Sequence, residues 1–162
     1  MATSGSNRDK EADFTQKRGK TYYDYKGHIA IDKNSEVIKT VEFTKASLRD
    51  SKAFGQLIDY NEEAVFADKG YANQLRRKKL RRKNIFDGIL LKAYRDKLLS
   101  QSEIRLNKLL STVRNKFKRP FAYMKQNLNY QRCSYYDLKN NRFEFIMAAF
   151  VYNIRKLITA LT

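Results

Sequence analysis

The sequence is poor in residues that cross-link or break a chain. Its 162 residues include one cysteine, one proline, one histidine and no tryptophan. The single cysteine, Cys133, excludes an intrachain disulfide and a cysteine-based zinc site, and a free thiol in a reducing compartment is expected. The most apolar stretch, residues 143–161, is interrupted by Asn153, Arg155 and Lys156, too soon to span a bilayer. We therefore expect a core helix there and no membrane partner.

Acidic residues are scarce beside basic ones. The chain has 34 Lys plus Arg against 17 Asp plus Glu, a formal net charge of +17. Such an excess favours a polyanion as partner, because bound cations release the counterions condensed on it. Solubility alone needs far less charge. We expect DNA as the partner and no small-molecule substrate. The first 20 residues are polar and charged, which predicts no signal peptide and a cytoplasmic, nucleoid-associated protein.

The hydrophobic content of 42%, with ten Phe and eleven Tyr, predicts one folded domain with a real core. Residues 1–18 are polar and predict a flexible segment. Residues 20–32 and 37–44 are rich in β-formers and flank the turn-forming group Lys33-Asn34-Ser35-Glu36. This order predicts an antiparallel hairpin.

The rest of the chain predicts alternating elements and then a helical end. We expect a helix at residues 51–60, a buried strand at 64–67, a helix at 71–83 and a strand at 85–91. After about Leu98 the pattern is helical, and Pro120 should kink or divide the first long run. The final helix places Ile146, Phe150, Ile154, Leu157 and Leu161 on one face, which we expect to face the core. The chain is thus predicted to be a mixed α/β domain.

Asp68 is the first candidate for chemistry. It follows the apolar run 64–67 and precedes Lys69-Gly70, so it stands where a strand leaves its sheet. A basic block follows it along the chain. A carboxylate beside such a block suggests a site for metal and phosphate, whereas the plainer interpretation is an Asp that shapes a turn or caps a helix.

The basic block contains seven cations and no acid: Arg76, Arg77, Lys78, Lys79, Arg81, Arg82 and Lys83. It could be a solvated helix face. We favour phosphate contact, because an unbalanced cationic block repels itself unless an anion neutralises it. His28 could be a base or a ligand, but a structural histidine with a hydrogen-bonded ring is the more frequent case.

Five blocks of residues follow one another in a familiar order. They are Gly19-Lys20 with Tyr25-Lys26-Gly27-His28 and Asp32; Thr44 with Ala46 and Asp50-Ser51; Ala67-Asp68-Lys69-Gly70-Tyr71; Arg114 with Phe117, Phe121 and Lys125; and Leu138 with Asn141 and Asn153. They resemble the GK…GYKxHxxxD, TxAxxxDS, A-D-x-G-Y, R-x-x-V-E-H-x-F-x-x-x-K and GLxKN…N motifs of bacterial insertion-sequence DDE transposases. The resemblance runs from about Asp13 to the C-terminus.

The resemblance implies a ribonuclease-H-like catalytic domain, here residues 19–162. In that family three acids hold two divalent metals, with Mg²⁺ as the cofactor of an active enzyme, and the metals stabilise the entering and leaving oxygens of DNA cleavage. The family pattern makes Asp68 the second acid, a catalytic residue and metal ligand. It also places Arg114 and Lys125 at the DNA, together with the basic block.

Two of the three acids have no counterpart in this sequence. The family's first acid lies in a strand upstream of the GYK block, and that strand is missing, so the expected fold is a ribonuclease-H-like mixed sheet lacking its first strand, with a helical C-terminal part. The third acid should stand at position 118, which is Lys118, a cation that repels Mg²⁺. Glu103 lies roughly 22 Å away along the same helix. We therefore expect DNA strand cleavage to be lost.

Three functions follow from these residues. The chain is either a transposase remnant that binds DNA without cutting it, a basic protein that competes or dimerises with intact transposase, or a non-functional product of a decaying element. A homo-oligomer is also among the expected assemblies.

Overall fold

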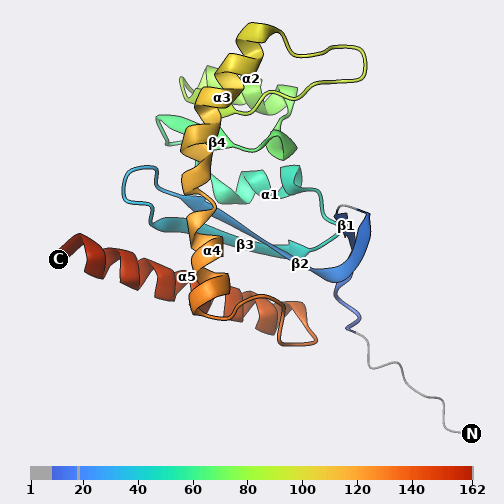
Figure 1. The fold of residues 1–162 in the computed structure, drawn as a ribbon, viewed down its shortest axis with the longest axis vertical. Helices are drawn as coiled ribbons and strands as arrows, with labels where there is room; N and C mark the ends of the chain where they lie inside the picture. The colour runs from blue at the N-terminus through green and yellow to red at the C-terminus, as the bar shows by residue number, and fades with distance from the viewer. Residues whose placement is uncertain (1–8, 18, 162) are drawn as a thin grey trace, which may run out of the picture.

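Two small sheets and a column of helices build the part of the chain that the computed structural model describes, residues 9–17 and 19–161 (Figure 1). The first sheet is antiparallel, with β1 (Asp13–Lys17), β2 (Lys20–Ile31) and β3 (Ile38–Lys45) in that order. The second pairs β4 (Ala64–Ala67) and β5 (Phe86–Ile89) in parallel. The predicted mixed α/β class is confirmed.

The predicted hairpin is confirmed, with Lys26 opposite Thr44 and His28 opposite Glu42. Its turn is shaped by Asp32, whose Oδ1 accepts the backbone N–H groups of Asn34 (3.0 Å) and Ser35 (2.7 Å), as short acidic side chains do in turns.

The prediction of a flexible segment at residues 1–18 is wrong for residues 13–17, which form β1 against residues 20–24 of β2. Edge-to-face packing of the Phe14 and Tyr23 rings, with centroids 4.8 Å apart, accompanies this pairing. The prediction also covers residues 1–8 and 18, which lie outside the described residues.

The second sheet has a core of its own. Helices α1 (Asp50–Leu57) and α2 (Gln74–Arg82) pack beside β4 and β5, and a short 3₁₀ turn, η1 (Lys69–Tyr71), leads from β4 towards α2. The buried side chains of this core are Phe54, Val65, Leu80, Ile85 and Ile89. Both strands and both helices were predicted, and α2 begins three residues later than expected because residues 69–71 form the 3₁₀ turn.

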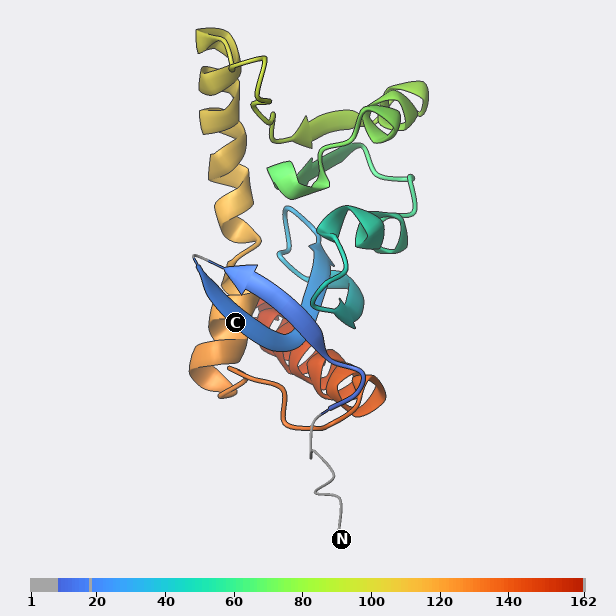
Figure 2. The same cartoon turned by 90° about the vertical axis from the view of Figure 1, so that its right-hand side faces the viewer.

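A helical column joins the two sheets. Helix α3 (Gln101–Lys116) lies against β4, and α4 (Arg119–Asn127) lies against the last helix, α5 (Leu138–Leu161). Figure 2 shows the column along one side of the molecule, with α5 beneath the antiparallel sheet. Pro120 stands in the first turn of α4, so the predicted division of this helical run is confirmed.

The larger core lies between the antiparallel sheet and α5. Its buried members include Tyr25, Phe43, Met124, Phe145 and Tyr152. Gly27 permits the close approach of β2 and α5, since a Cβ there would lie 2.4 Å from the ring of Phe145.

The face of α5 that meets this core is not the predicted one. The buried residues of the helix are Asn141, Phe145, Ala148, Ala149 and Tyr152. The predicted core residues Ile146, Phe150, Ile154, Leu157 and Leu161 are instead 41–88% exposed. The rotation of the helix is set by specific partners: Phe145 fits beneath Gly27, and the Asn153 amide exchanges two hydrogen bonds with the backbone of Ile38 (2.8 and 2.9 Å).

Within the described residues, the two sheets are not hydrogen-bonded to each other. In this part of the chain β4 pairs only with β5, and residues 25–31 of β2 pair only with β3. Among the helices that the structure describes, none combines the length and the hydropathy that a bilayer span requires.

Candidate functional site

Asp68 stands at the C-terminal end of β4, as predicted. Its backbone is extended (φ −68°, ψ 158°), and its carbonyl accepts the N–H of Tyr71 at 2.9 Å, which closes the 3₁₀ turn η1. The main chain of Asp68 thus takes part in a turn, as the plainer interpretation expected. Its side chain, however, caps no backbone N–H. The carboxylate remains available for another partner.

That partner is Arg114 of α3. Its Nη2 donates to Oδ2 of Asp68 at 2.8 Å, and its Nε forms an ion pair with Oδ1. Both side chains are partly exposed, at 32% and 43%. Two residues that the sequence assigned to metal and to DNA therefore bind each other.

Asp68 and Arg114 line a cleft of about 950 Å³ between the two sheets. Residues 24–34 of β2 and its turn and residues 62–68 at β4 line the cleft without interruption, so the edges of both strands face it. Lys118 and Lys125 of the helical column also line it, whereas α2 does not. The position expected to carry the third acid thus contributes a cation to the same cleft as Asp68.

These residues do not fit a magnesium centre. Mg²⁺ needs several oxygen ligands, and two such ions need several acids. Among the described residues, no group of three or more His, Cys, Asp or Glu side chains could hold a metal ion. Glu103 instead completes a capping box with Ser100 at the start of α3. Other carboxylates line the cleft, namely Asp24, Asp32, Asp50, Asp59, Glu62 and Glu63, but they form no such group with Asp68, which a guanidinium already binds.

His28 lies near this site and is 5% exposed. Its Nδ1 lies 3.0 Å from the Tyr71 hydroxyl and its Nε2 lies 3.2 Å from the Thr44 hydroxyl. Burial lowers the pKa of His28 and raises the pKa of Tyr71 to about 12. The interpretation of His28 as a structural residue with a hydrogen-bonded ring is confirmed, and this network ties β2 to η1.

Helix α2 divides its cations into two groups. Asn73 caps the helix by accepting the N–H groups of Leu75 (2.9 Å) and Arg76 (3.2 Å). The Arg76 guanidinium turns inward, where it donates to the Ser51 carbonyl at 2.6 Å and stacks 3.9 Å above the Phe54 ring. Burial lowers the pKa of Arg76. This arginine holds α2 to α1.

Arg77 is also used inside the protein. It donates to Oδ2 of Asp87 at 2.6 Å and to the carbonyls of Ile89 (3.0 Å) and Leu90 (3.2 Å), which fixes α2 against β5. The other cations of the block are exposed, and none forms an ion pair within residues 9–17 and 19–161: Lys78, Lys79, Arg81, Arg82 and Lys83. Lys79 also lies 3.6 Å from the centroid of the Tyr60 ring. We call these five side chains the α2 cation patch.

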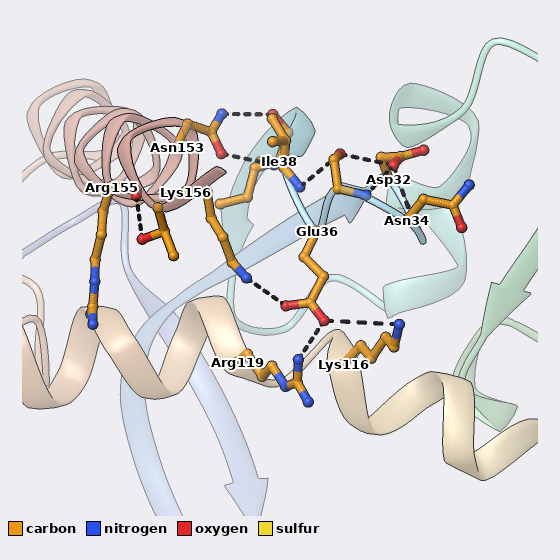
Figure 3. Close-up of polar contacts among 12 residues, drawn as sticks. Asp32, Asn34, Glu36, Ile38, Lys116, Arg119, Asn153, Arg155 and Lys156 are labelled. Carbon is orange, nitrogen blue, oxygen red and sulfur yellow. Dashed lines mark hydrogen bonds and ion pairs between the residues drawn. The ribbon is translucent and has the colours of Figure 1, made fainter. Parts of the chain in front are cut away.

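A cluster that the sequence did not reveal lies at the β2–β3 turn (Figure 3). Glu36, in the β2–β3 turn, has a positive φ of 57° and a side chain only 7% exposed. It accepts Nζ of Lys156 at 2.8 Å, pairs with Arg119, and lies 4.0 Å from Nζ of Lys116. The bonds to Arg119 and Lys156 lower the pKa of Glu36.

The only sequence signals for this cluster were indirect ones. Asn153, which belongs to the last resemblance block, lies beside it and bonds Ile38 (Figure 3). Nothing in the sequence pairs Glu36 with Arg119 and Lys156, which lie 83 and 120 residues away along the chain. Lys116 and Arg119 would otherwise add to the positive surface, and here they stabilise the hairpin turn.

Comparisons with known proteins agree with the motifs. The sequence profile of the family described as "Transposase DDE domain" matches residues 2–154. The chain is 29% identical over 133 residues to the transposase for insertion sequence element IS1106 of Neisseria meningitidis serogroup B. The match covers 81% of this chain and 46% of that protein, so the chain spans about half the length of this curated relative. No solved structure matches the chain.

Proposed function

The chain belongs to the Transposase DDE domain family of insertion-sequence transposases, and we propose that it binds DNA through the α2 cation patch without cutting it. The observation that carries the second half of this proposal is the set of side chains around Asp68. Asp68 is paired with Arg114, and Lys118 occupies the same cleft where a second acid would be needed. Strand cleavage requires two divalent cations held by several acids, and a carboxylate that is paired with a guanidinium in a cleft shared with Lys118 supplies too few free ligands.

The binding half of the proposal rests on the exposed cations. The α2 cation patch has no acid partner in the described structure, while the chain carries a net charge of +17. Lys92, Arg95 and Lys97 follow β5 and are exposed as well. A duplex contacted by five cations should show a slope of log K against log salt of about −4.5, from about −0.9 per phosphate. We place the protein at the nucleoid as a consequence of this binding.

We propose a ribonuclease-H-like arrangement for the two sheets, with the cleft between β2 and β4 as the place of a further strand. The support is the uninterrupted lining of that cleft by both strands and the lack of any described strand between them. We propose no strand cleavage or strand transfer for this chain, because no three His, Cys, Asp or Glu side chains gather among the described residues to hold a metal ion.

A chain that binds DNA but cannot cut it would compete with intact transposase for the same DNA. One observation favours this role over that of a non-functional product: the features for DNA binding are kept, whereas those for cleavage are not. The α2 cation patch and the Asn73 cap are present, while position 118 is a lysine and no three acids gather among the described residues.

The test combines binding and cleavage on the same protein. Fluorescence anisotropy with a labelled random duplex of 30 base pairs, titrated with salt, should give a steep negative slope, and a duplex carrying the element's terminal repeat should bind more tightly. Supercoiled plasmid with Mg²⁺ should remain uncut. Mg²⁺-dependent nicking that disappears in Asp68→Ala would overturn the proposal, and equal affinity for both duplexes would remove the competitor role.

A further inference from the structure

The loop between α4 and α5, residues 128–137, displays two neighbouring tyrosine rings. Tyr135 is 52% exposed and Tyr136 is 73% exposed. Within residues 9–17 and 19–161, neither ring stacks on another aromatic ring or on a cation. We call these two side chains the tyrosine pair. We propose that the tyrosine pair stacks on the unpaired bases of single-stranded DNA, an inference that rests on the proposed DNA binding and gives it a second site.

Two other tyrosines of this region have structural roles. The Tyr123 ring meets the Tyr152 ring edge-to-face with centroids 5.6 Å apart, and the Tyr130 ring lies 5.8 Å from the ring of Phe145 in the larger core. Aromatic side chains usually pack in this way, because each ring removes a large apolar area from water. The tyrosine pair instead leaves its ring surface open to solvent, where another flat group can reach it.

The backbone that carries the tyrosine pair is fixed by hydrogen bonds. Asn141, which is 0% exposed, accepts the N–H of Tyr135 at 3.1 Å and donates to the carbonyl of Tyr135 at 2.7 Å. Asn141 also donates to the carbonyl of Asp137 at 2.7 Å. At the start of the loop, the N–H of Tyr130 donates to the carbonyl of Met124 at 3.0 Å. Rings held on an ordered backbone lose little conformational entropy when they bind a ligand.

The charges around the tyrosine pair favour a nucleic acid as its partner. The neighbouring acids bind groups of their own chain: Asp137 accepts a backbone N–H in the first turn of α5 at 2.6 Å, and Glu144 accepts the Ser134 hydroxyl at 2.8 Å. Arg132 of the same loop and Lys125 of α4 are exposed, and neither forms an ion pair within the described residues. Aromatic rings that stack on bases, beside cations that contact phosphates, are the usual means of binding single strands without sequence preference.

The tyrosine pair and the α2 cation patch are separate surfaces. Figures 1 and 2 both show the loop between α4 and α5 at one end of the helical column and α2 near the other end. Charge alone attracts any DNA, whether it has one strand or two. Stacking on a side chain needs a base whose face is not already covered by its neighbours. The tyrosine pair should therefore select single-stranded DNA, which the α2 cation patch does not.

The experiment measures the fluorescence anisotropy of a labelled oligothymidine of about 20 nucleotides, longer than a single stacking site requires. The α2 cation patch is first weakened by four substitutions: Lys78→Gln, Arg81→Gln, Arg82→Gln and Lys83→Gln. The weakened chain should still bind the oligothymidine. Adding Tyr135→Ala with Tyr136→Ala should reduce that affinity at least about tenfold, because base stacking is lost. The slope of log K against log salt should stay the same, since no phosphate contact is removed.

Tyr135→Phe with Tyr136→Phe is the matched control. It keeps both rings and removes only the hydroxyls, so the affinity for oligothymidine should be retained. Tyr94→Ala is the second control: its ring is 58% exposed and already lies 5.9 Å from Lys92, in the connection between β5 and α3. This variant should bind oligothymidine like its parent. Far-UV circular dichroism and the thermal midpoint of each variant exclude misfolding.

Three results would overturn the inference. The first is a weakened chain that binds no oligothymidine, and the second is binding that Tyr135→Ala with Tyr136→Ala leaves unchanged. The third is an equal loss in the phenylalanine variant, because stacking does not use the hydroxyls. Each of these leaves duplex binding by the wild-type chain intact, whereas a wild-type chain that binds no duplex contradicts the proposed function.

Discussion

The hairpin region and the α2 region use their cations in opposite ways. At the hairpin, Lys116, Arg119 and Lys156 converge on a single buried acid, Glu36. At α2, Arg77 alone reaches an acid, Asp87, and the exposed cations of the α2 cation patch reach none within the described chain. The first arrangement joins a turn to three helices. The second leaves a positive surface open to solvent.

This difference teaches how to interpret a large net charge. A formal charge of +17 indicates an anionic partner only through those cations that do not already bind groups of the same chain. Arg76, Arg77 and Arg114 belong to the basic residues that the sequence assigned to DNA, yet each donates to groups of its own chain. The surface that remains for phosphate is narrower than the basic block and centres on the last two turns of α2.

The largest expected effect distinguishes the two cores beneath these surfaces. Phe145→Ala should lower the free energy of unfolding by about 3–5 kcal/mol, because it empties the space beneath Gly27. Leu80→Ala in the second core should cost about 2–5 kcal/mol. Urea denaturation followed by circular dichroism measures both.

The shape of those transitions tests whether the regions fold together. A single transition that both substitutions shift would show one cooperative unit. Two separable transitions, each moved by only one substitution, would show that the cleft divides the molecule energetically. A loss below about 1 kcal/mol for Phe145→Ala would contradict the description of the hairpin core.

The second effect concerns binding. Replacing Lys78, Arg81, Arg82 and Lys83 by Gln should reduce the slope of log K against log salt by about 3.6 and weaken DNA binding about a hundredfold at moderate salt. The matched control changes four exposed lysines elsewhere to Gln: Lys10, Lys20, Lys45 and Lys139. Anisotropy titrations compare the two. Equal losses would mean that total charge, and not the α2 cation patch, governs binding.

Local patterns in the sequence predicted most elements, and distant contacts decided the rest. The apolar run 64–67 lies between Glu63 and Asp68, so its strand was predicted at its observed bounds. The face that α5 buries could not be predicted, because both of its faces are apolar and the choice depends on Gly27 and Ile38, more than 110 residues away. β1 was missed since its polar sequence becomes a strand only through β2.

The site shows the same limit. Asp68 was found from its local context, and the lysine at position 118, where the family pattern has an acid, was visible directly in the sequence. The pairing of Asp68 with Arg114, across 46 positions, depends on where α3 lies against β4. Motif spacing places residues on elements. It does not show which of them bind each other.

The third effect tests the hairpin side of the comparison. Glu36→Gln should lower the free energy of unfolding at pH 7 by about 1–3 kcal/mol, less than for a fully buried pair because Arg119 and Lys116 are 61% and 40% exposed. Thermal unfolding measures this loss. Asp32→Asn, which alters the same turn without touching the cations, serves as the control.

The pH dependence of stability gives an independent check on Glu36. The pKa of Glu36 in the folded chain lies below its ordinary value of 4.5. Its contribution is therefore present above pH 4.5 and is lost as the pH falls through the folded pKa. Between about pH 5 and pH 2 the wild type should lose more stability than Glu36→Gln. Parallel curves for the two proteins would show that Glu36 is not stabilised by its cations.

The smallest expected effect lies at the junction of the two regions. Arg114→Gln removes the partner of Asp68, and because both side chains are partly exposed the free energy of unfolding should fall by only about 0–1 kcal/mol. If Arg114 only blocked a metal site that is otherwise complete, the Arg114→Gln variant would bind Mg²⁺ and nick plasmid DNA. We expect neither, since freeing the Asp68 carboxylate creates no group of three ligands among the described residues and leaves Lys118 in the cleft. Isothermal titration with MgCl₂ measures the binding, and millimolar or tighter affinity in Arg114→Gln but not in Asp68→Asn would show that the missing chemistry is suppressed, not lost.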